Sequence, residues 1–527
     1  MEPGDEAPVH RRSRRLEGAE RRLLKGYAPL LVVSVAVVAL VVVFPSRMRD
    51  TAESRPARAG TQSQTASGWS TTVEPCPGAG SQVEGDPYSP PCFTFTGDNG
   101  GATSKGVTAE EITVSYRVTT DPNALSLLAT LMGIEFNETG EDFLRTMEGL
   151  VDYFNANFEL YGREMRLEPF EGKGSLVDEL VGGGQENATN DGLKAGVELE
   201  AFADITAQTQ PYSEGLVKQQ TIAFGAPYMS REWFTDRRPY AWSLASDCSV
   251  VAEAASAYGL QRLIGQPAVF AGGELEGETR KLAVISPNNP EYQQCSAAGL
   301  QVIEDAGEEI DLVTDYVLDL GRIPNQAKSI SAQLVSQGIT TISCFCDPFM
   351  LLNLTQEIES QGLEPEWIVT GTGFVDLDLI GQGLANKNDQ WTRAFGASPL
   401  ADQAPEGESA GYEAFKSVRP DEEPSQAVDV LYYQLYQLAL GIQMAGPDLT
   451  PQNLETGLFS YPEATGPAGT WDYFVESYTP IVDLREVWWD PEVTSPFNGE
   501  AGSYNSNDER FRPGDLPEGQ PEVFLDE

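Results

Sequence analysis

The chain has almost no histidine. The only one among its 527 residues is His10, which lies ahead of a long apolar run. A Ser-His-Asp or Cys-His nucleophile, a His-ligated zinc and a His-Glu-x-x-His helix each need an imidazole, so the residues beyond that run cannot form them. We therefore expect no catalytic residues, no metal site and no cofactor. Carboxylate-only catalysis, as in glycosidases, is the enzymatic chemistry that stays open.

Positive charge is also scarce. The chain has 34 Lys and Arg against 80 Asp and Glu, and its formal net charge is -46. A surface that negative repels phosphate backbones, which excludes nucleic acid as a partner. Neither a G-x-G-x-x-G loop nor a G-x-x-x-x-G-K-[ST] loop is present, so dinucleotide and P-loop cofactors lack their motifs.

One apolar run approaches the length that crosses a bilayer. Residues 27–44 (YAPLLVVSVAVVALVVVF) carry no charge and follow a basic segment that contains Arg11, Arg12, Arg14, Arg15, Arg21, Arg22 and Lys25. Positive charge on the leading side places residues 1–26 in the cytoplasm. We expect a single-pass anchor in the cell membrane with the C-terminal bulk extracytoplasmic, and a cleaved signal peptide is the alternative.

All six cysteines follow the apolar run, and their even number suits disulfides in an oxidising compartment. Cys76 and Cys92 bracket a Pro/Gly-rich loop and are natural partners for each other. The other four allow several pairings, which the sequence leaves open: Cys248, Cys295, Cys344 and Cys346.

Composition divides the exported part into three. Residues 45–109 are rich in Ser, Thr, Gly and Pro, which predicts a flexible stalk. Residues 496–527 are polar, acidic and punctuated by Gly and Pro, which predicts a disordered acidic tail. Between them, strand-like runs such as 111–118 and 281–286 alternate with amphipathic helical runs such as 141–160. This alternation predicts an α/β fold with parallel sheets covered on both faces.

Four stretches in this middle region resemble one known family. They are Gly106–Val118 (GVTAEEITVSYRV), Tyr161–Lys173 (YGREMRLEPFEGK), Gln219–Ser230 (QQTIAFGAPYMS) and Lys281–Tyr292 (KLAVISPNNPEY). In this order they resemble type I periplasmic binding proteins of the branched-chain amino-acid and amide group. The resemblance spans about residues 106–495 and depends on strand and helix placement more than on any invariant motif.

The resemblance implies two Rossmann-like lobes joined by three hinge crossings. Lobe I would take residues 110–245 and 376–470. Lobe II would take residues 246–375 and 471–495. A ligand would then lie between the lobes.

Ligands of open α/β sheets bind beyond the carboxyl ends of the strands. The strand-to-helix turns therefore supply the candidate ligand-binding residues: Thr209, Tyr212, Tyr228, Asn289, Tyr292, Asp347 and Thr372. By the resemblance, the Thr209 hydroxyl suits a ligand carboxylate and the Tyr292 ring covers the ligand, while Asp347 could hold an ammonium group. The competing interpretation is structural, because the tyrosines could be packing aromatics and Asp347 could be a helix N-cap before Pro348.

The expected function is binding rather than catalysis. The resemblance implies a solute-binding protein that captures a small, amino-acid-like or amide-like molecule for an ABC permease. An α-amino acid is in doubt, because the family's amino-acid binders have an acidic group where this chain has Thr372. The alternatives are a ligand sensor that reports to a membrane partner and an extracellular glycan-active enzyme that uses paired carboxylates.

Overall fold

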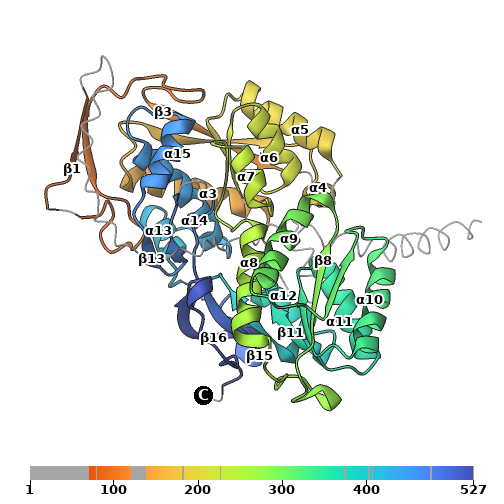
Figure 1. The fold of residues 1–527 in the computed structure, drawn as a ribbon. Helices are drawn as coiled ribbons and strands as arrows, with labels where there is room; N and C mark the ends of the chain where they lie inside the picture. Colours follow the sequence, from red (N-terminus) through yellow and green to blue (C-terminus); the bar gives the residue numbers. More distant parts are fainter. Residues whose placement is uncertain are drawn as a thin grey trace, which may run out of the picture.

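Two β-sheets, one in each lobe, organise the chain (Figure 1). The structure is a computed structural model that describes residues 71–525, apart from 79, 120–137, 181–182, 226, 373–374, 402–403, 406 and 475–476. No helix in these described ranges is both long and apolar enough to cross a membrane. The anchor predicted at 27–44 lies outside them.

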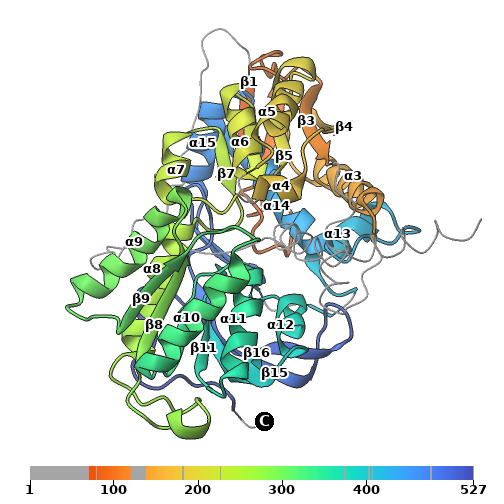
Figure 2. The same cartoon turned by 90° about the vertical axis from the view of Figure 1, so that its right-hand side faces the viewer.

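Lobe I is built on a parallel sheet in the order β4-β3-β5-β6-β7. Its strands are β3 (Glu111–Val118), β4 (Glu164–Glu171), β5 (Ala203–Ala207), β6 (Ile222–Gly225) and β7 (Ala241–Ser243). Its helices are α3 (Gly140–Asn157), α4 (Leu176–Leu180), α5 (Gln185–Leu193), α6 (Gln210–Lys218), α7 (Arg231–Asp236), α13 (Ala410–Val418), α14 (Val428–Ala445) and α15 (Pro451–Ser460). Helix α3 packs against β4, α13 and α14, while α6 packs against β5, β6 and α5 (Figure 2).

Helix α3 shows how local sequence sets an element. Thr139 caps it, because its hydroxyl accepts from the Asp142 backbone N–H while the Asp142 carboxylate accepts from the Thr139 backbone N–H. Its buried side chains, which include Met147, Leu150 and Phe154, recur every three or four residues. The amphipathic helix predicted over 141–160 is therefore confirmed, with its end at Asn157.

Lobe II has a mixed sheet in the order β16-β15-β12-β11-β10-β8-β9, in which β15 and β16 are antiparallel additions to five parallel strands. The strands are β8 (Leu282–Pro287), β9 (Leu312–Tyr316), β10 (Thr341–Cys344), β11 (Glu366–Val369), β12 (Ala394–Ser398), β15 (Leu484–Thr494) and β16 (Ala501–Phe511). The helices are α8 (Cys248–Tyr258), α9 (Pro290–Asp305), α10 (Ile323–Gln337), α11 (Pro348–Ser360) and α12 (Asp378–Ala385). Helices α8 and α9 pack together, as do α10 and α11.

The described elements show that the chain passes between the lobes three times: first between β7 and α8, second between β12 and α13, and third before β15. The expectation that residues 376–398 belong to lobe I is wrong, because β12 pairs with β11 and β15 of lobe II. The β12 sequence AFGAS hides this, since glycine is usually a strand breaker. Here Gly396 is required, because a Cβ atom would lie 2.2 Å from the Val369 carbonyl oxygen.

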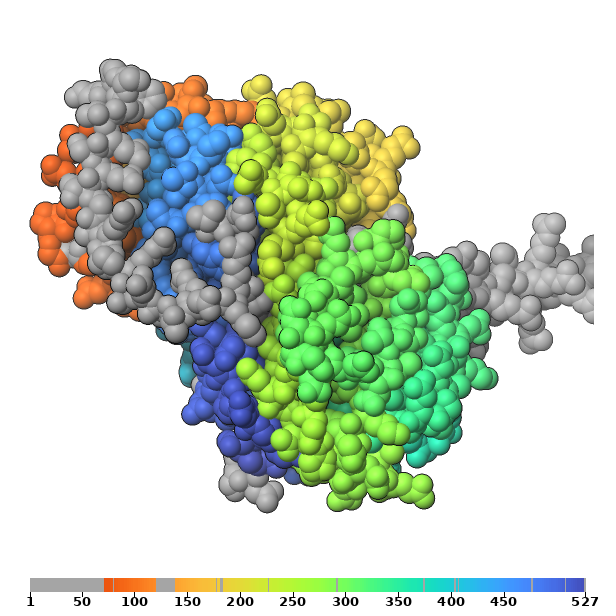
Figure 3. Space-filling model, viewed as in Figure 1, coloured from red at the N-terminus to blue at the C-terminus, as the bar shows by residue number. Residues whose placement is uncertain are grey.

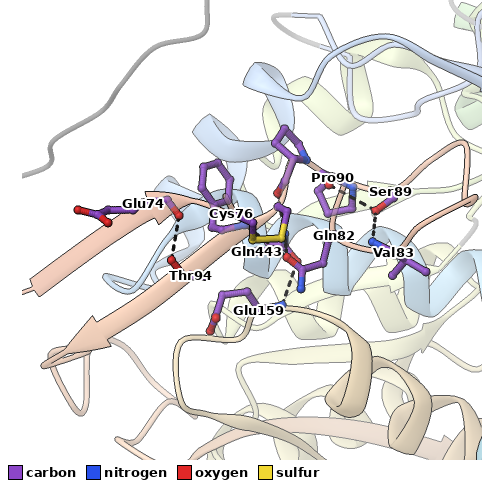
Figure 4. Close-up of a disulfide and its surroundings, with 12 residues drawn as sticks. Glu74, Cys76, Gln82, Val83, Ser89, Pro90, Thr94, Glu159 and Gln443 are labelled. Atoms are coloured by element: carbon purple, nitrogen blue, oxygen red, sulfur yellow. Dashed lines mark hydrogen bonds between the residues drawn. A yellow bond between two sulfur atoms is a disulfide. The ribbon is translucent and has the colours of Figure 1, made fainter. Parts of the chain in front are cut away.

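The described part of the predicted stalk, residues 71–109, is folded, and we call it the N-terminal arm. Its strands β1 (Thr71–Pro75) and β2 (Phe93–Gly97) form an antiparallel hairpin closed by the Cys76–Cys92 disulfide (Figure 4). Gln443 of α14 donates to the Gln82 side chain at 3.1 Å. The prediction of flexibility is wrong for this part, because lobe I supplies partners for the arm's polar groups.

The arm also reaches the third crossing. A short hairpin of β13 (Ala464–Gly466) and β14 (Gly469–Trp471), here called the hinge hairpin, leads into that crossing. Tyr88 of the arm is 1% exposed, and its hydroxyl donates to the Gly469 carbonyl oxygen at 2.6 Å. Its ring lies 4.7 Å from that of Trp471, centroid to centroid. The N-terminal arm is thus fastened to the hinge.

The predicted disordered tail is also folded over its described residues. Strand β16 forms the edge of the lobe II sheet, and Leu516 and Val523 beyond it are buried in the core of that lobe. Figure 3 places this dark blue C-terminal region on the side of lobe II. The prediction of disorder is wrong because an edge strand is held by backbone hydrogen bonds to its neighbour, here β15, and can therefore carry polar side chains.

Arg510 of β16 binds two of the three crossings at once. Its guanidinium donates to the Asp483 carboxylate at 2.9 Å, to the Pro399 carbonyl at 2.8 Å and to the Leu400 carbonyl at 3.0 Å. Asp483 in turn accepts from the Thr470 backbone N–H in the hinge hairpin. A single side chain therefore joins the second crossing to the third.

Three disulfides bridge the cysteines. The predicted Cys76–Cys92 pair is confirmed. Of the pairings left open by the sequence, the structure has Cys248–Cys295, which ties α8 to α9, and Cys344–Cys346 at the end of β10. No cysteine in the described ranges is free.

We predict that Arg510→Ala lowers the free energy of unfolding by about 2–4 kcal/mol, because the buried Asp483 carboxylate loses its charged partner and the Pro399 carbonyl loses its donor. Arg512→Ala is the matched control, since the Arg512 pair with Glu463 is exposed and its loss costs about 0–1 kcal/mol. Urea unfolding of the full chain measures both. Equal losses in the two variants would contradict the role assigned to Arg510.

Candidate functional site

The strand order reverses once in each sheet, and these reversals locate the candidate site. Lobe I reverses between β3 and β5, and lobe II reverses between β8 and β10. Ligands of such sheets bind outside the carboxyl ends of the strands at these points. The turn after β5 carries Thr209, the turn after β10 carries Asp347, and β8 is followed by Asn289 and Tyr292.

The carboxyl ends of the two sheets meet through three of the predicted residues. Tyr228 follows β6 of lobe I, and its hydroxyl lies 3.0 Å from the Thr372 hydroxyl, which follows β11 of lobe II. The Tyr228 ring also lies 6.3 Å from the ring of Tyr292, centroid to centroid, at an interplanar angle of 40°. The structure thus brings Tyr228, Tyr292 and Thr372 together across the lobes.

Thr209 and Tyr212 lie apart from this contact, in a buried polar network of lobe I. The Thr209 hydroxyl donates to the Glu179 carboxylate, which also accepts from Arg117 at 2.9 and 3.0 Å. The Tyr212 hydroxyl donates to Asp204 at 2.7 Å, and the Arg117 guanidinium stacks 3.7 Å above the Tyr212 ring centroid. The hydroxyl that was expected to bind a ligand carboxylate is therefore engaged by a carboxylate of the protein.

Asp347 and Asn289 both have structural partners in lobe II. Asp347 is the N-cap of α11, accepting from the backbone N–H groups of its first turn, and it also accepts from the Tyr316 hydroxyl at 2.6 Å. Asn289 precedes α9, and its side-chain oxygen accepts from the Leu318 backbone N–H at 2.9 Å. The N-cap interpretation of Asp347 is confirmed, and its carboxylate remains half-buried at the end of β10.

Two further carboxylates near Tyr228 were missed by sequence reasoning. Asp247 is the N-cap of α8 in the first crossing, and Asp376 follows the turn after β11. Both are 5% exposed, and the negative charge of each contributes to raising the pKa of the Tyr228 phenol, after burial and the Tyr292 phenol. A capping aspartate before the helix CSVVAEAASAY was the sequence signal for Asp247. The sequence around Asp376, FVDLD, contained no comparable signal.

Burial dominates the electrostatics of this site. Loss of solvation raises the pKa of Asp376 to about 6, although the Ser398 hydroxyl donates to it at 2.8 Å. The same effect raises the pKa of Asp247 to about 7, against the opposing charge of Arg231. Burial likewise raises the pKa of Asp347. Three carboxylates at the lobe junction therefore lack enough positive charge to offset their desolvation.

The arrangement suits reversible binding of a small molecule. Hydroxyls and aromatic rings come from both lobes at one junction. The described residues contain no group of three or more His, Cys, Asp or Glu side chains that could hold a metal ion. Such a set can bind a polar solute without covalent chemistry.

The sequence by itself matches no known family model and no curated protein. The fold, however, is similar to solved structures of ABC-transporter solute-binding proteins. One from R. palustris, in complex with 4-hydroxybenzoate, has a TM-score of 0.52 and 13% identity, covering 77% of this chain and 98% of that chain.

Two further solved structures extend the likeness. A leucine-, isoleucine-, valine-, threonine- and alanine-binding protein from Brucella ovis has a TM-score of 0.52 and 12% identity, covering 78% of this chain and 98% of that chain. An ABC-transporter substrate-binding protein from Aeropyrum pernix has a TM-score of 0.50 and 15% identity, covering 77% and 96%. The chain thus has the fold of type I periplasmic solute-binding proteins, as the resemblance implied, and these neighbours are binding proteins rather than enzymes.

We predict that Asp376→Asn changes stability in a pH-dependent way. The folded pKa of about 6 lies above the ordinary value of 3.8, so the folded wild-type protein binds more protons and loses stability as the pH rises through this window. Relative to wild type, the variant should gain about 1–2 kcal/mol between about pH 4.5 and pH 8. Urea unfolding at the two pH values measures this change.

The control for this experiment is Asp142→Asn. Hydrogen bonds from Thr139 and Arg145 lower the pKa of Asp142 to about 2, so its ionisation is complete throughout the window. The stability difference between this variant and wild type should therefore be the same at both pH values. A pH-independent difference for Asp376→Asn would contradict the raised pKa.

Proposed function

We propose that this protein is an extracytoplasmic solute-binding protein that captures a small molecule between its two lobes for an ABC importer. The observation that carries the proposal is the junction of Tyr228 with Thr372 and Tyr292, which joins the strand ends of opposite lobes. The fold of the solved neighbours supports it, since the neighbours named above are solute-binding proteins.

Hinge closure is the mechanism that follows from this arrangement. A solute that touches both lobes binds more tightly when they are closed, so it shifts the population toward the closed state by that difference in affinity. No covalent step is needed. A closed, loaded protein then differs in shape from the empty one, and a permease can distinguish them.

The seven predicted contact residues divide into two groups on this proposal. Tyr228, Tyr292, Thr372 and Asp347 lie at or near the lobe junction and are proposed to face the solute. Thr209, Tyr212 and Asn289 hold the surrounding loops through the Glu179, Asp204 and Leu318 contacts. From the resemblance, the solute is amino-acid-like or amide-like.

Residues 27–44 are proposed to anchor the protein in the cell membrane by a single span, with the lobes outside the cell. The uncharged apolar run and the basic residues before it support this placement. An anchored binding protein stays close to its permease, which removes the need for diffusion through an open compartment.

A ligand sensor is the second candidate, and the N-terminal arm favours it. Tyr88 fastens the arm to Gly469 and Trp471 of the hinge hairpin, so movement at the hinge reaches the chain on the membrane side. The genes beside this one separate the two functions, because permease and ATPase genes favour transport, whereas a kinase gene favours sensing.

A thermal-shift screen of the full chain against amino acids, amides, aromatic acids and small sugars tests solute binding. Bound solute raises the melting temperature by an amount that grows with its concentration over Kd. We predict that Tyr292→Ala abolishes the shift given by the best solute and leaves the protein folded, because the ring is half-buried at the junction.

Tyr412→Ala is the control, since Tyr412 is another half-buried tyrosine but lies in α13 of lobe I. It should keep the full shift. An undiminished shift in Tyr292→Ala would remove Tyr292 from the site, and a screen in which no solute raises the melting temperature would contradict the proposed function.

A further inference from the structure

We propose that the solute carries a positively charged amine or ammonium group and no carboxylate, an inference that rests on the proposed function and removes amino acids from its solute class. The solutes named for two of the solved neighbours, 4-hydroxybenzoate and a set of amino acids, all contain a carboxylate. The charges and hydrogen bonds at this lobe junction favour the opposite sign.

The position expected to bind a carboxylate is already filled from within the chain. Thr209 donates its only hydroxyl proton to Glu179, and both carboxylate oxygens of Glu179 accept from Arg117. Asp191 lies 3.4 Å from the same guanidinium, so two carboxylates surround one cation. Thr209, Glu179 and Arg117 are 1%, 3% and 4% exposed. A solute carboxylate at this position would find the Thr209 and Arg117 donors already engaged by protein carboxylates. It would also be repelled by the excess negative charge.

The lobe junction adds further negative charge. Asp376 lies between β11 and α12, four residues after Thr372, and Asp247 lies at the first crossing. Both act electrostatically on the Tyr228 phenol that joins the lobes. Asp347 lies at the end of β10, bound to Tyr316, whose phenol interacts in turn with that of Tyr292. Asp247 and Asp376 thus act on Tyr228 directly, whereas Asp347 is linked to Tyr292 through Tyr316.

The guanidinium groups nearest these carboxylates have other partners. Arg231 forms a bidentate pair with Glu253 at 3.1 and 2.7 Å, and its Nε atom is 4.0 Å from Asp247. Arg485 donates to the carbonyl oxygens of Leu400 and Ala401 in the second crossing. Both guanidinium groups therefore already have acceptors within the chain.

The aromatic pair supplies the complementary apolar surface. Tyr228 and Tyr292 come from opposite lobes, and cations are attracted to aromatic faces within about 6 Å of the ring centroid. An ammonium group beside both rings would touch both lobes, which is the requirement for favouring closure. The buried Ser246 hydroxyl, directly before Asp247, has no hydrogen-bond partner within the described chain, so it can accept from or donate to a polar solute.

The test compares matched solutes with the full chain in detergent. Benzylamine, choline and putrescine form the cationic set, and benzoate, isovalerate and succinate form the carboxylate set, all at equal concentration. We expect at least one cation to raise the melting temperature by several degrees and no carboxylate to do so. A shift with a carboxylate but with no cation would overturn the charge assignment and still support solute binding. No shift with either set would overturn the inference. Solute binding itself would then be decided by the screen against amino acids, amides, aromatic acids and small sugars described above.

Two variants test whether the shift in melting temperature arises from binding at the lobe junction. At about pH 8, above the pKa of about 6 for Asp376, Asp376→Asn should weaken binding of the active cation by about tenfold or more, because it removes a buried negative charge that acts on Tyr228. Glu500→Gln is the matched control, since it removes the same charge from an exposed turn between β15 and β16 and should leave the affinity unchanged. Asp247→Asn provides a second test if Asp376→Asn fails to fold by circular dichroism. Equal affinity of wild type and the folded Asp variant would overturn the inference.

Discussion

The ion pair between Arg510 and Asp483 is the constraint on which the two-lobe arrangement depends. Arg510 lies on the last strand of lobe II, yet its guanidinium binds the second crossing through Pro399 and Leu400 and the third through Asp483. Because Asp483 also accepts from Thr470, the clamp extends into the hinge hairpin. One side chain thus couples two of the three crossings on which the proposed hinge closure depends.

Both flanking segments of the chain converge on this hinge. The N-terminal arm reaches it through Tyr88, and the C-terminal strand β16 reaches it through Arg510. Strand β16 also positions the loop after β11, because Ser503 and Tyr504 bind the Asp378 carboxylate, and that loop carries Thr372 and Asp376. Segments that could pass for dispensable extensions thus support the hinge and the proposed site together.

The sequence predicted the parts of this structure that depend on local pattern. The apolar strand 111–118 and the amphipathic helix near 141–160 are present because their patterns match a buried strand and a one-sided helix. Strands β12 and β16 were missed, since AFGAS has few strand-forming residues and AGSYNSNDERF is polar, and tertiary pairing with β11 and β15 decides both. The candidate turns were placed by chain order. The Thr209 bond to Glu179 and the contact of Tyr228 with Thr372 arise between distant segments, which no local pattern encodes.

The central claim is that one solute is held by both lobes at the junction of Tyr228, Tyr292 and Thr372. Hydrogen–deuterium exchange of the full chain, with and without the solute that gives the largest thermal shift, tests it most directly. The account predicts slower exchange at residues 227–230 of lobe I and, at the same solute concentration, at residues 290–294 and 369–372 of lobe II. Protection confined to one lobe, or lying elsewhere, would contradict it.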